Sequence, residues 1–317
     1  MRWRGRVTPV GLVDLKAGAG QNIKDSPHPW SRYVALGDSF TEGIGDPEPG
    51  SVGGLRGWAD RVAEELSARQ PDFAYANLAV RGLRLQQILD QQVGPALAAM
   101  PDLVTLSAGG NDIVFRRSDP DKLAEKIDAG VEQLTRSGAT VVLFAGPDWG
   151  TTPVFGQIRG KVAILNENLH LVAARHGAVM VDLWCLRDLT RPGMWDPDRL
   201  HFSPLGHHTI ALGVLQALAV SHSLEPLQPK ALPPRNWKEA RVGDLAWARE
   251  YLVPWAIRQV RHPTGAPLVP KRPRPGPVFG HGHLPAVHPA GLPAEPLPAE
   301  PLPAEPLSAE PLSLNEA

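Results

Sequence analysis

The chain has 317 residues, and 43% of them are hydrophobic, which is enough for one or two domains with a sizeable core. Its formal net charge of −1 gives no general attraction to nucleic acid, and we expect no nucleic-acid partner. The single cysteine, Cys185, excludes an intrachain disulfide. Because Cys185 lies in the apolar run VDLWCL, we expect a buried and unreactive thiol.

The first 30 residues lack sustained periodicity, and they predict a loosely ordered N-terminal extension. Asp14 and Lys16 interrupt its weakly apolar stretch before that stretch reaches the length of a signal peptide. The longest apolar run elsewhere, residues 209–220, is too short to span a bilayer. We therefore expect no integral membrane segment and a cytoplasmic location.

Residues 31–223 alternate between short apolar runs and helical patterns, and we interpret them as one domain. The apolar runs predict strands at residues 32–36, 73–79, 102–108, 140–146 and 178–183. The helical patterns cover residues 57–70, 85–97 with an interruption near Gly94 and Pro95, 121–138, 158–176 and 204–220, the last capped by Ser203. Alternating strands and helices predict an α/β fold of the flavodoxin-like kind: a three-layer α/β/α sandwich around a five-stranded parallel sheet.

The composition changes twice after residue 223. Residues 224–262 predict an amphipathic, Trp-rich helical extension with an excess of basic residues. It either packs on the domain or makes a weak contact with a membrane or a protein. Residues 263–317 are rich in proline and end in LPAEP repeats, which predict a disordered, extended tail without helix or sheet pairing.

Residues suited to catalysis follow the predicted strand ends, where ligand sites form in parallel sheets. GDSFTEG places Ser39 after the first strand, NLAVRG places Gly82 after the second, and SAGGND places Asn111 after the third. The loop before the last helix, WDPDRLHFSPLGH, carries Asp198 and His201. Each residue alone is weak evidence, because turns are rich in such residues. Their joint appearance in this order indicates one site.

These four blocks resemble those of the SGNH, or GDSL-like, hydrolases, a family named after Ser, Gly, Asn and His. The matching residues are Ser39, Gly82, Asn111 and His201. The resemblance covers about residues 31–220 and continues more weakly through the Trp-rich helix. The opening YVALGDSFTEG looks like that of bacterial members, although Phe40 stands where GDSL has its leucine. No G-x-S-x-G elbow is present, which argues against the larger α/β-hydrolase fold.

The resemblance implies a catalytic triad of Ser39, Asp198 and His201. His201 would take the serine proton, and Asp198 would orient the imidazole. The oxyanion hole would consist of the backbone N–H groups of Ser39 and Gly82 and the side-chain amide of Asn111. Asp196 is a rival for the orienting acid, but the D-x-x-H spacing favours Asp198.

We therefore expect a serine hydrolase that cleaves a carboxylic ester through an acyl-serine intermediate, without metal or cofactor. A metal site formed by His201, His207, His208 and Asp198 is an alternative, but the triad already uses two of these residues. The four blocks fit a short acyl, lipid, thioester or acetyl-sugar substrate equally. Trp149, Phe155 and Trp195 either line its pocket or cover the sheet edge.

Two alternatives of other classes stay open. One is a non-catalytic ligand- or carbohydrate-binding module on the same fold. The other is a scaffold that acts through the basic helix and the Pro-rich tail. An enzyme is expected to keep its activity when residues 224–317 are deleted, whereas a scaffold would lose its binding.

Overall fold

The structure is a computed structural model that describes residues 28–150, 155–228, 247–254, 257 and 269–278. All of these residues belong to one compact unit within residues 1–282. The predicted extension up to residue 27 lies outside the described residues, as do most of the predicted C-terminal helix and the repeats of the tail.

Six strands form a single sheet with the order β5-β4-β3-β1-β2-β6. Their bounds are β1 Arg32–Leu36, β2 Ala74–Asn77, β3 Leu103–Leu106, β4 Thr140–Ala145, β5 Val179–Asp182 and β6 Arg272–Pro277. The first five strands are parallel, as the alternating pattern predicts. Helices cover both faces of a parallel sheet, and its strands are therefore apolar along their whole length. All four residues of β3 are buried in this way.

Strand β6 corrects the prediction that residues 263–317 make no sheet pairing. Residues 272–277, RPRPGP, pair antiparallel with β2, with Arg272 opposite Asn77 and Gly276 opposite Tyr75. Proline cannot donate a backbone hydrogen bond, and it is tolerated on an edge strand where its missing N–H faces outward. The prolines of β6 alternate with Arg and Gly, so one edge of the strand keeps its donors for β2. That alternation is the feature that the prediction overlooked.

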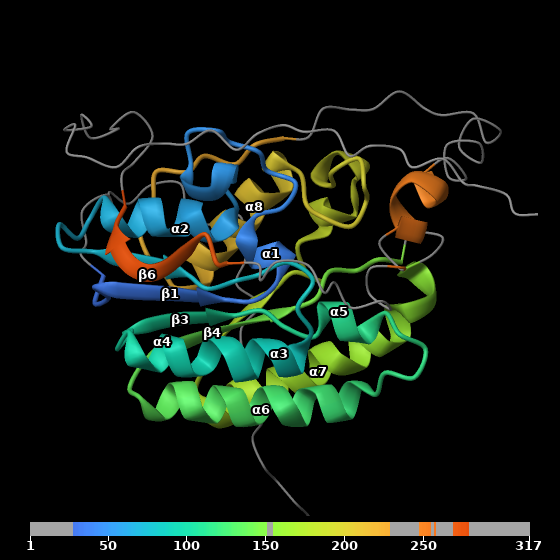
Figure 1. The fold of residues 1–317 in the computed structure, drawn as a ribbon, viewed down its shortest axis with the longest axis horizontal. Coiled ribbons are helices and arrows are strands. Elements are labelled where there is room, and N and C mark those ends of the chain that lie inside the picture. The colour runs from blue at the N-terminus through green and yellow to red at the C-terminus, as the bar shows by residue number, and fades with distance from the viewer. Residues whose placement is uncertain (1–27, 151–154, 229–246, 255–256, 258–268, 279–317) are drawn as a thin grey trace, which may run out of the picture. The chain divides into compact units, whose positions relative to one another are not determined.

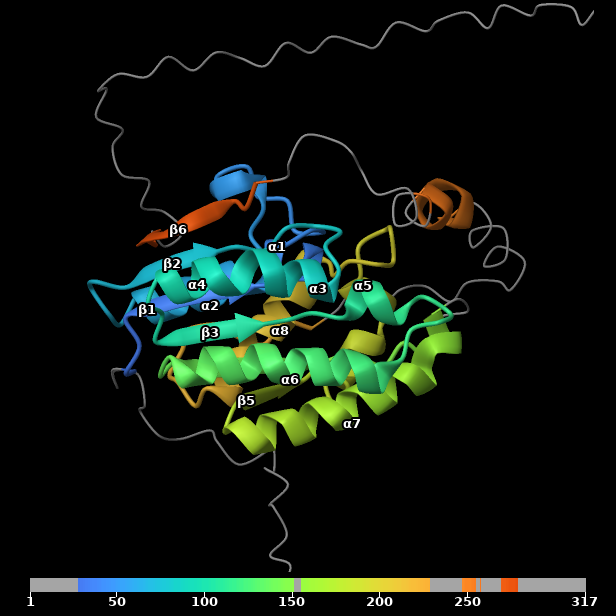
Figure 2. The same ribbon diagram turned by 60° about the horizontal axis from the view of Figure 1, so that its bottom comes forward.

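Helices lie on both faces of the sheet (Figure 1). One face is covered by α2 and α8, and the other by α3, α4, α6 and α7, which Figure 2 brings to the front. The α-helices are α1 Ser39–Glu42, α2 Trp58–Ser67, α3 Leu85–Ile88, α4 Gly94–Ala98, α5 Gly110–Ile113, α6 Pro120–Arg136, α7 Arg159–His176 and α8 Pro204–Ala217. The short 3-10 helices are η1 Val52–Gly54, η3 Phe155–Ile158, η4 Arg187–Thr190 and η5 Pro192–Met194.

Helix α8 begins as the sequence predicts. Ser203 is its N-cap, the Ser203 hydroxyl accepts a hydrogen bond from the backbone N–H of Gly206, and Pro204 is the first helical residue. The buried residues of α8, among them Ile210 and Val214, pack against β1, β4 and β5 in one of two core clusters. The second cluster lies on the opposite face, under α6 and α7.

The predicted interruption near Gly94 and Pro95 takes the form of a π-helical turn. The chain runs from α3 through η2, the π turn Leu89–Val93, directly into α4. Proline removes one backbone donor and crowds the preceding turn of an α-helix. A wider π turn just before Pro95 relieves that conflict without ending the helix.

Two further segments of the predicted extensions are described. Trp30 is buried, and its indole N–H donates to the hydroxyl of Thr140 at 3.0 Å. Residues Ala248–Leu252 form η6, a π-helical turn within the predicted C-terminal helix. Among the described helices, none combines the length and the apolar character that crossing a bilayer requires.

Candidate active site

The loops that follow β1, β2, β3 and β5 bring the predicted site residues to the carboxyl end of the sheet. Helices α1 and α5, which follow β1 and β3, lie at this end (Figure 1). The chain leaves β1 for β2 on one side, and β3 lies on the other side of β1. This reversal of strand order opens a crevice between the two loops, where open α/β sheets bind their ligands.

The turn between β1 and α1 is closely packed around Gly37. Gly37 has a φ of +156°, and a Cβ at this position would lie 2.4 Å from the hydroxyl of Thr41 and 2.9 Å from the carbonyl oxygen of Ser107. Only glycine fits such an approach without displacement. Ser39 follows two residues later as the first residue of α1, which fixes its side chain at the strand end.

The structure joins Ser39, His201 and Asp198 in a hydrogen-bonded relay. His201 Nε2 lies 2.9 Å from Ser39 Oγ, and His201 Nδ1 lies 2.5 Å from Asp198 Oδ2. A histidine between a hydroxyl and a carboxylate can take the hydroxyl proton at one nitrogen while the carboxylate holds the other. The arrangement is therefore able to activate Ser39 as a nucleophile.

Asp198, and not its rival Asp196, faces the imidazole. The second carboxylate oxygen of Asp198 accepts the backbone N–H groups of Leu200 at 2.8 Å and His201 at 2.9 Å. Burial favours the neutral acid, but these bonds and the contact with His201 outweigh it and lower the pKa of Asp198. Asp196 instead accepts the backbone N–H of Asp198, and burial raises its pKa.

Asn111 reaches the same crevice, but both hydrogens of its amide have partners. Its Nδ2 donates to the carbonyl oxygen of Leu83 at 3.0 Å and to Asp38 Oδ2 at 3.1 Å. The bond to Leu83 joins the β3 loop to the turn that carries Gly82, whose φ is +79°. An oxyanion could therefore bind the Asn111 amide only if one of these bonds were released or shared.

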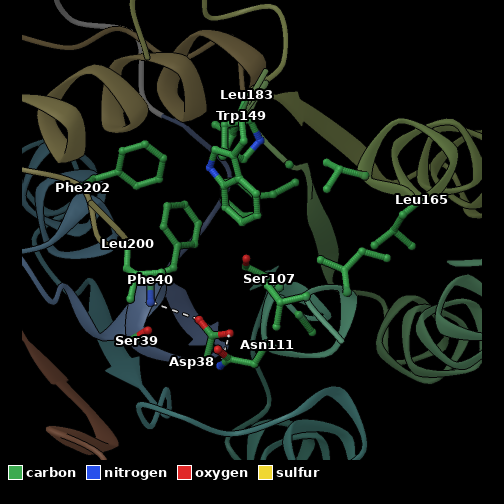
Figure 3. A pocket seen from close by; sticks show the side chains of 18 of the residues that line it. Asp38, Ser39, Phe40, Ser107, Asn111, Trp149, Leu165, Leu183, Leu200 and Phe202 are labelled. Atoms are coloured by element: carbon green, nitrogen blue, oxygen red, sulfur yellow. Dashed lines mark hydrogen bonds between the residues drawn. The ribbon is translucent and has the colours of Figure 1, made fainter. Parts of the chain in front are cut away.

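Asp38 holds Asn111 in place together with the carbonyl oxygen of Leu83. It is the N-cap of α1, where its Oδ1 accepts the backbone N–H of Phe40 at 3.1 Å (Figure 3). Burial raises the pKa of Asp38 to about 6. The buried carboxylate of Asp38 therefore connects the turn that carries Ser39 with Asn111.

An apolar cavity opens beside Ser39 (Figure 3). It runs between the β3 and β4 loops and helix α7, and Trp149 and Trp195 both contribute to it, as one of the two open interpretations predicts. The side chain of Phe155 lies outside the described residues. The apolar residues of its lining include Phe40, Val114, Phe144, Trp149, Val162, Leu165, Leu169, Leu183, Trp195, Leu200 and Phe202.

The sequence comparison agrees with this geometry. The sequence model of the GDSL-like Lipase/Acylhydrolase family matches residues 35–209, more than half of the chain. The chain belongs to the GDSL-like lipase/acylhydrolase family. No curated protein sequence matches it.

Solved structures share the fold of this GDSL-like hydrolase at low sequence identity. LAE5, an alpha/beta hydrolase enzyme from the metagenome of Lake Arreo, Spain, is 21% identical with a TM-score of 0.50, over 61% of this chain and 97% of LAE5. TesA is 21% identical with a TM-score of 0.50, over 59% and 97%. A catalytic mutant of Axe2, an acetylxylan esterase from Geobacillus stearothermophilus, is 18% identical with a TM-score of 0.50, over 60% and 95%. Identities this low establish a common fold only.

The two histidines of α8 do not join the triad in a metal site. His207 is fully buried, its Nδ1 accepts the backbone N–H of Trp58 at 3.2 Å, and its Nε2 donates to the carbonyl oxygen of Ile44 at 3.0 Å. Burial lowers the pKa of His207 to about 3, so the ring is a neutral link between α8 and α2. His208 Nε2 bonds to the carbonyl oxygen of Glu225. Over the part of the chain that the structure describes, no cluster of His, Cys, Asp or Glu has the geometry to hold a metal ion.

The prediction that Cys185 is buried is wrong, because its side chain is exposed. Strand β5 ends at Asp182, and the following turn carries Cys185 outward although its neighbour Leu183 is buried. The thiol donates to Asp182 Oδ2 at 2.9 Å, and this hydrogen bond to a carboxylate raises the pKa of Cys185. The residue is therefore exposed but still a poor thiolate former.

Three residues that support the site of this GDSL-like hydrolase were missed at the level of sequence. Asp38 carries a local signal, because an Asp just before a short helix is a typical N-cap. Asn166 and Trp247 carry no local signal. Asn166 bonds to both the N–H and the carbonyl oxygen of Gly146 in the lining of the cavity. The Trp247 indole donates to the carbonyl oxygen of Asp198. Contacts between distant parts of the chain leave no mark in a local pattern.

Proposed function

We propose that this GDSL-like hydrolase cleaves carboxylic esters, with Ser39 as nucleophile, His201 as general base and acid, and Asp198 as the orienting acid. The observation that carries the proposal is the relay from Asp198 through His201 to Ser39, with contacts of 2.5 and 2.9 Å. An unassisted serine hydroxyl is a weak nucleophile, and a base within hydrogen-bond reach is what activates it.

The reaction proceeds in two halves. His201 takes the proton of Ser39 while Ser39 Oγ attacks the ester carbonyl carbon, and the protonated imidazole then gives that proton to the leaving alcohol. The acyl group is left on Ser39. Water then repeats the sequence in place of Ser39, releasing the acid and restoring the serine. Asp198 stabilises the imidazolium in both halves without taking its proton.

The oxyanion of each tetrahedral intermediate is held by the backbone N–H groups of Ser39 and Gly82 and by the amide of Asn111. The amide reaches it by sharing the hydrogen that Asn111 donates to Asp38 at 3.1 Å. Charge that develops on the oxyanion competes for this hydrogen with the Asp38 carboxylate. Losing one such donor costs about 10²–10³ in kcat.

The lining of the cavity favours an ester with an apolar acyl group. Aromatic and branched aliphatic side chains surround the space next to Ser39. Binding is favourable when an apolar acyl chain removes their surface from water. An acetyl group would leave most of this surface in contact with water. No observation favours the alternative of a non-catalytic binding module, since Ser39, His201 and Asp198 are present and in contact.

The decisive experiment compares wild type with Ser39→Ala on p-nitrophenyl esters of increasing acyl length. We expect turnover that rises from the acetyl ester to esters of medium length and disappears in Ser39→Ala. A fluorophosphonate should label wild type at Ser39 and leave Ser39→Ala unlabelled. Full esterase activity in Ser39→Ala would contradict the proposal. A wild type that neither hydrolyses any ester nor reacts with the fluorophosphonate would contradict it as well.

A further inference from the structure

A part of the chain beyond the family match contacts the loop that carries the acid and the base. We call residues 196–201 the acid–base loop. Trp247, which lies well past residue 209 where the match ends, has 8% of its surface exposed. Its indole N–H donates to the carbonyl oxygen of Asp198 at 2.7 Å, and the guanidinium of Arg199 lies 5.1 Å from the centroid of its ring.

The acid–base loop contains a turn that needs outside support. Arg199 has a φ of +54°, in the left-handed region that residues other than glycine avoid. This turn points the backbone N–H groups of Leu200 and His201 at Asp198 Oδ1, at 2.8 and 2.9 Å. Such conformations persist where surrounding contacts hold them. Trp247 contacts both residues on which the turn hinges, Asp198 and Arg199.

We propose that Trp247 is a positioning residue for Asp198, so that the C-terminal extension is part of the working hydrolase. By holding the Asp198 carbonyl oxygen and covering Arg199, the indole fixes the turn that aims the Asp198 carboxylate at His201. The inference rests on the proposed function, in which Asp198 is the orienting acid. It goes beyond the triad because it assigns a role to a segment outside residues 35–209.

The first test is Trp247→Phe in the full chain, which removes the indole N–H and keeps an aromatic ring over Arg199. We expect kcat to fall by about 10-fold because the carboxylate is no longer held within a fraction of an ångström of its place. KM should stay unchanged, since Trp247 is not part of the cavity lining. An unchanged kcat would overturn the inference, and so would a loss confined to KM.

Trp30→Phe is the matched control. Trp30 is also 8% exposed and also donates its indole N–H, here to Thr140 Oγ1 at the amino end of β4. Both substitutions therefore remove a buried indole donor, but only one lies at the acid–base loop. We expect Trp30→Phe to lower thermal stability and leave kcat unchanged. Equal losses of kcat in the two variants would reduce Trp247 to a general structural role.

A double-mutant cycle tests whether Trp247 acts through Asp198. In an Asp198→Asn background, adding Trp247→Phe should change kcat by less than about 2-fold, because residues that act as a unit are not additive. A full 10-fold loss in that background would show that Trp247 acts by another route, and the inference would fall.

A readout without turnover separates this inference from the proposed function. The N–H shared between His201 Nδ1 and Asp198 Oδ2, 2.5 Å apart, should give a far-downfield proton NMR signal. We expect that signal to move or broaden in Trp247→Phe and to stay in place in Trp30→Phe. An unaltered signal in Trp247→Phe would overturn the inference. If wild type cleaved no ester, the proposed function would fail while this comparison still judged the positioning role.

Discussion

The side chain of Gln92 holds the backbone of Gly37 by two hydrogen bonds: Nε2 donates to the carbonyl oxygen and Oε1 accepts the N–H, both at 2.8 Å. Gln92 is buried and lies on η2, the π turn before Pro95. A π turn changes the direction of the side chains that follow it, and such turns often serve functional sites. The position of Ser39 therefore depends on a helix that follows β2.

Substituting Gln92→Leu should weaken both the fold and the site. It leaves the N–H of Gly37 buried without a partner and removes one of the two donors to its carbonyl oxygen, which still accepts the N–H of Val80 at 3.2 Å. One unsatisfied buried group costs about 1–3 kcal/mol in the free energy of unfolding. We expect kcat to fall as well, because the turn before Ser39 loosens. Urea unfolding and ester kinetics would measure the two effects. Gln86→Leu, at an exposed position of α3, is the control and should change stability by less than about 0.5 kcal/mol. Equal effects of the two substitutions would contradict the role of Gln92.

The carboxyl of Asp38 should make stability depend on pH in an unusual direction. Burial raises its pKa to about 6, from an ordinary value of 3.8 in the unfolded chain. Between these values the folded state binds more protons, so this group stabilises the fold at low pH and loses that contribution as the pH rises through 6. Compared with Asp38→Asn, the wild type should lose about 2 kcal/mol in its free energy of unfolding between pH 4 and pH 7.

Urea unfolding of wild type and Asp38→Asn at both pH values measures this difference, in which the contributions of other carboxyls cancel. A difference between the two proteins that is independent of pH, or that grows in favour of wild type at pH 7, would contradict the raised pKa. The same variant replaces one of the two carboxylate oxygens of Asp38 with an NH2 group, so that a single oxygen remains for the N–H of Phe40 and the Asn111 amide. Its kcat reports whether the bond to Asp38 positions Asn111.

The sheet is the part of this protein that the sequence predicts well, and the sequence also predicts that Ser39, His201 and Asp198 lie at one end of it. Strand β1 was expected at its exact residues, because a buried parallel strand is an unbroken apolar run that stops at a glycine. The contacts among Ser39, His201 and Asp198 follow from the same rule, since loops after parallel strands must meet at one edge. Local pattern and chain topology were sufficient for both.

The features that escaped prediction depend on contacts between distant segments. The contact of Gln92 with Gly37, the strand β6 and the contact of Trp247 with Asp198 each pair residues that are far apart in sequence. The predicted burial of Cys185 was wrong for a local reason, because the turn after β5 places the end of this apolar segment at the surface. The expectation that residues 224–317 can be deleted without loss of activity ignored β6 and Trp247, and the structure argues against it.

The anchor of β6 offers a test of that last point. Lys271 Nζ lies 2.5 Å from Asp60 Oδ2, with 4% of the lysine side chain exposed. Replacing Lys271→Met keeps the length of the side chain but leaves the buried Asp60 carboxylate without its cationic partner, with the N–H of Gly57 as its remaining donor. We expect a loss of about 3–5 kcal/mol in the free energy of unfolding at pH 7, measured by urea denaturation. The exposed ion pair between Arg136 and Glu132 provides the control, and Arg136→Met should cost at most about 1 kcal/mol. Similar losses in both variants would show that the ion pair does not anchor β6.

The shape of the cavity predicts how acyl preference can be changed. Leu165 on α7 lies across the cavity from Ser39 in Figure 3. Leu165→Trp should fill the space that a long acyl chain needs, and we expect kcat/KM to fall by about 10-fold or more for medium and long esters. The acetyl ester, which does not reach Leu165, should change by less than about 3-fold. Leu171→Trp places the same bulk on the exposed face of α7, where 59% of Leu171 is accessible, and should alter neither. Unchanged kcat/KM for long esters in Leu165→Trp, or equal losses for short and long esters in a variant that unfolds at the same urea concentration as wild type, would contradict binding of the acyl chain in this cavity.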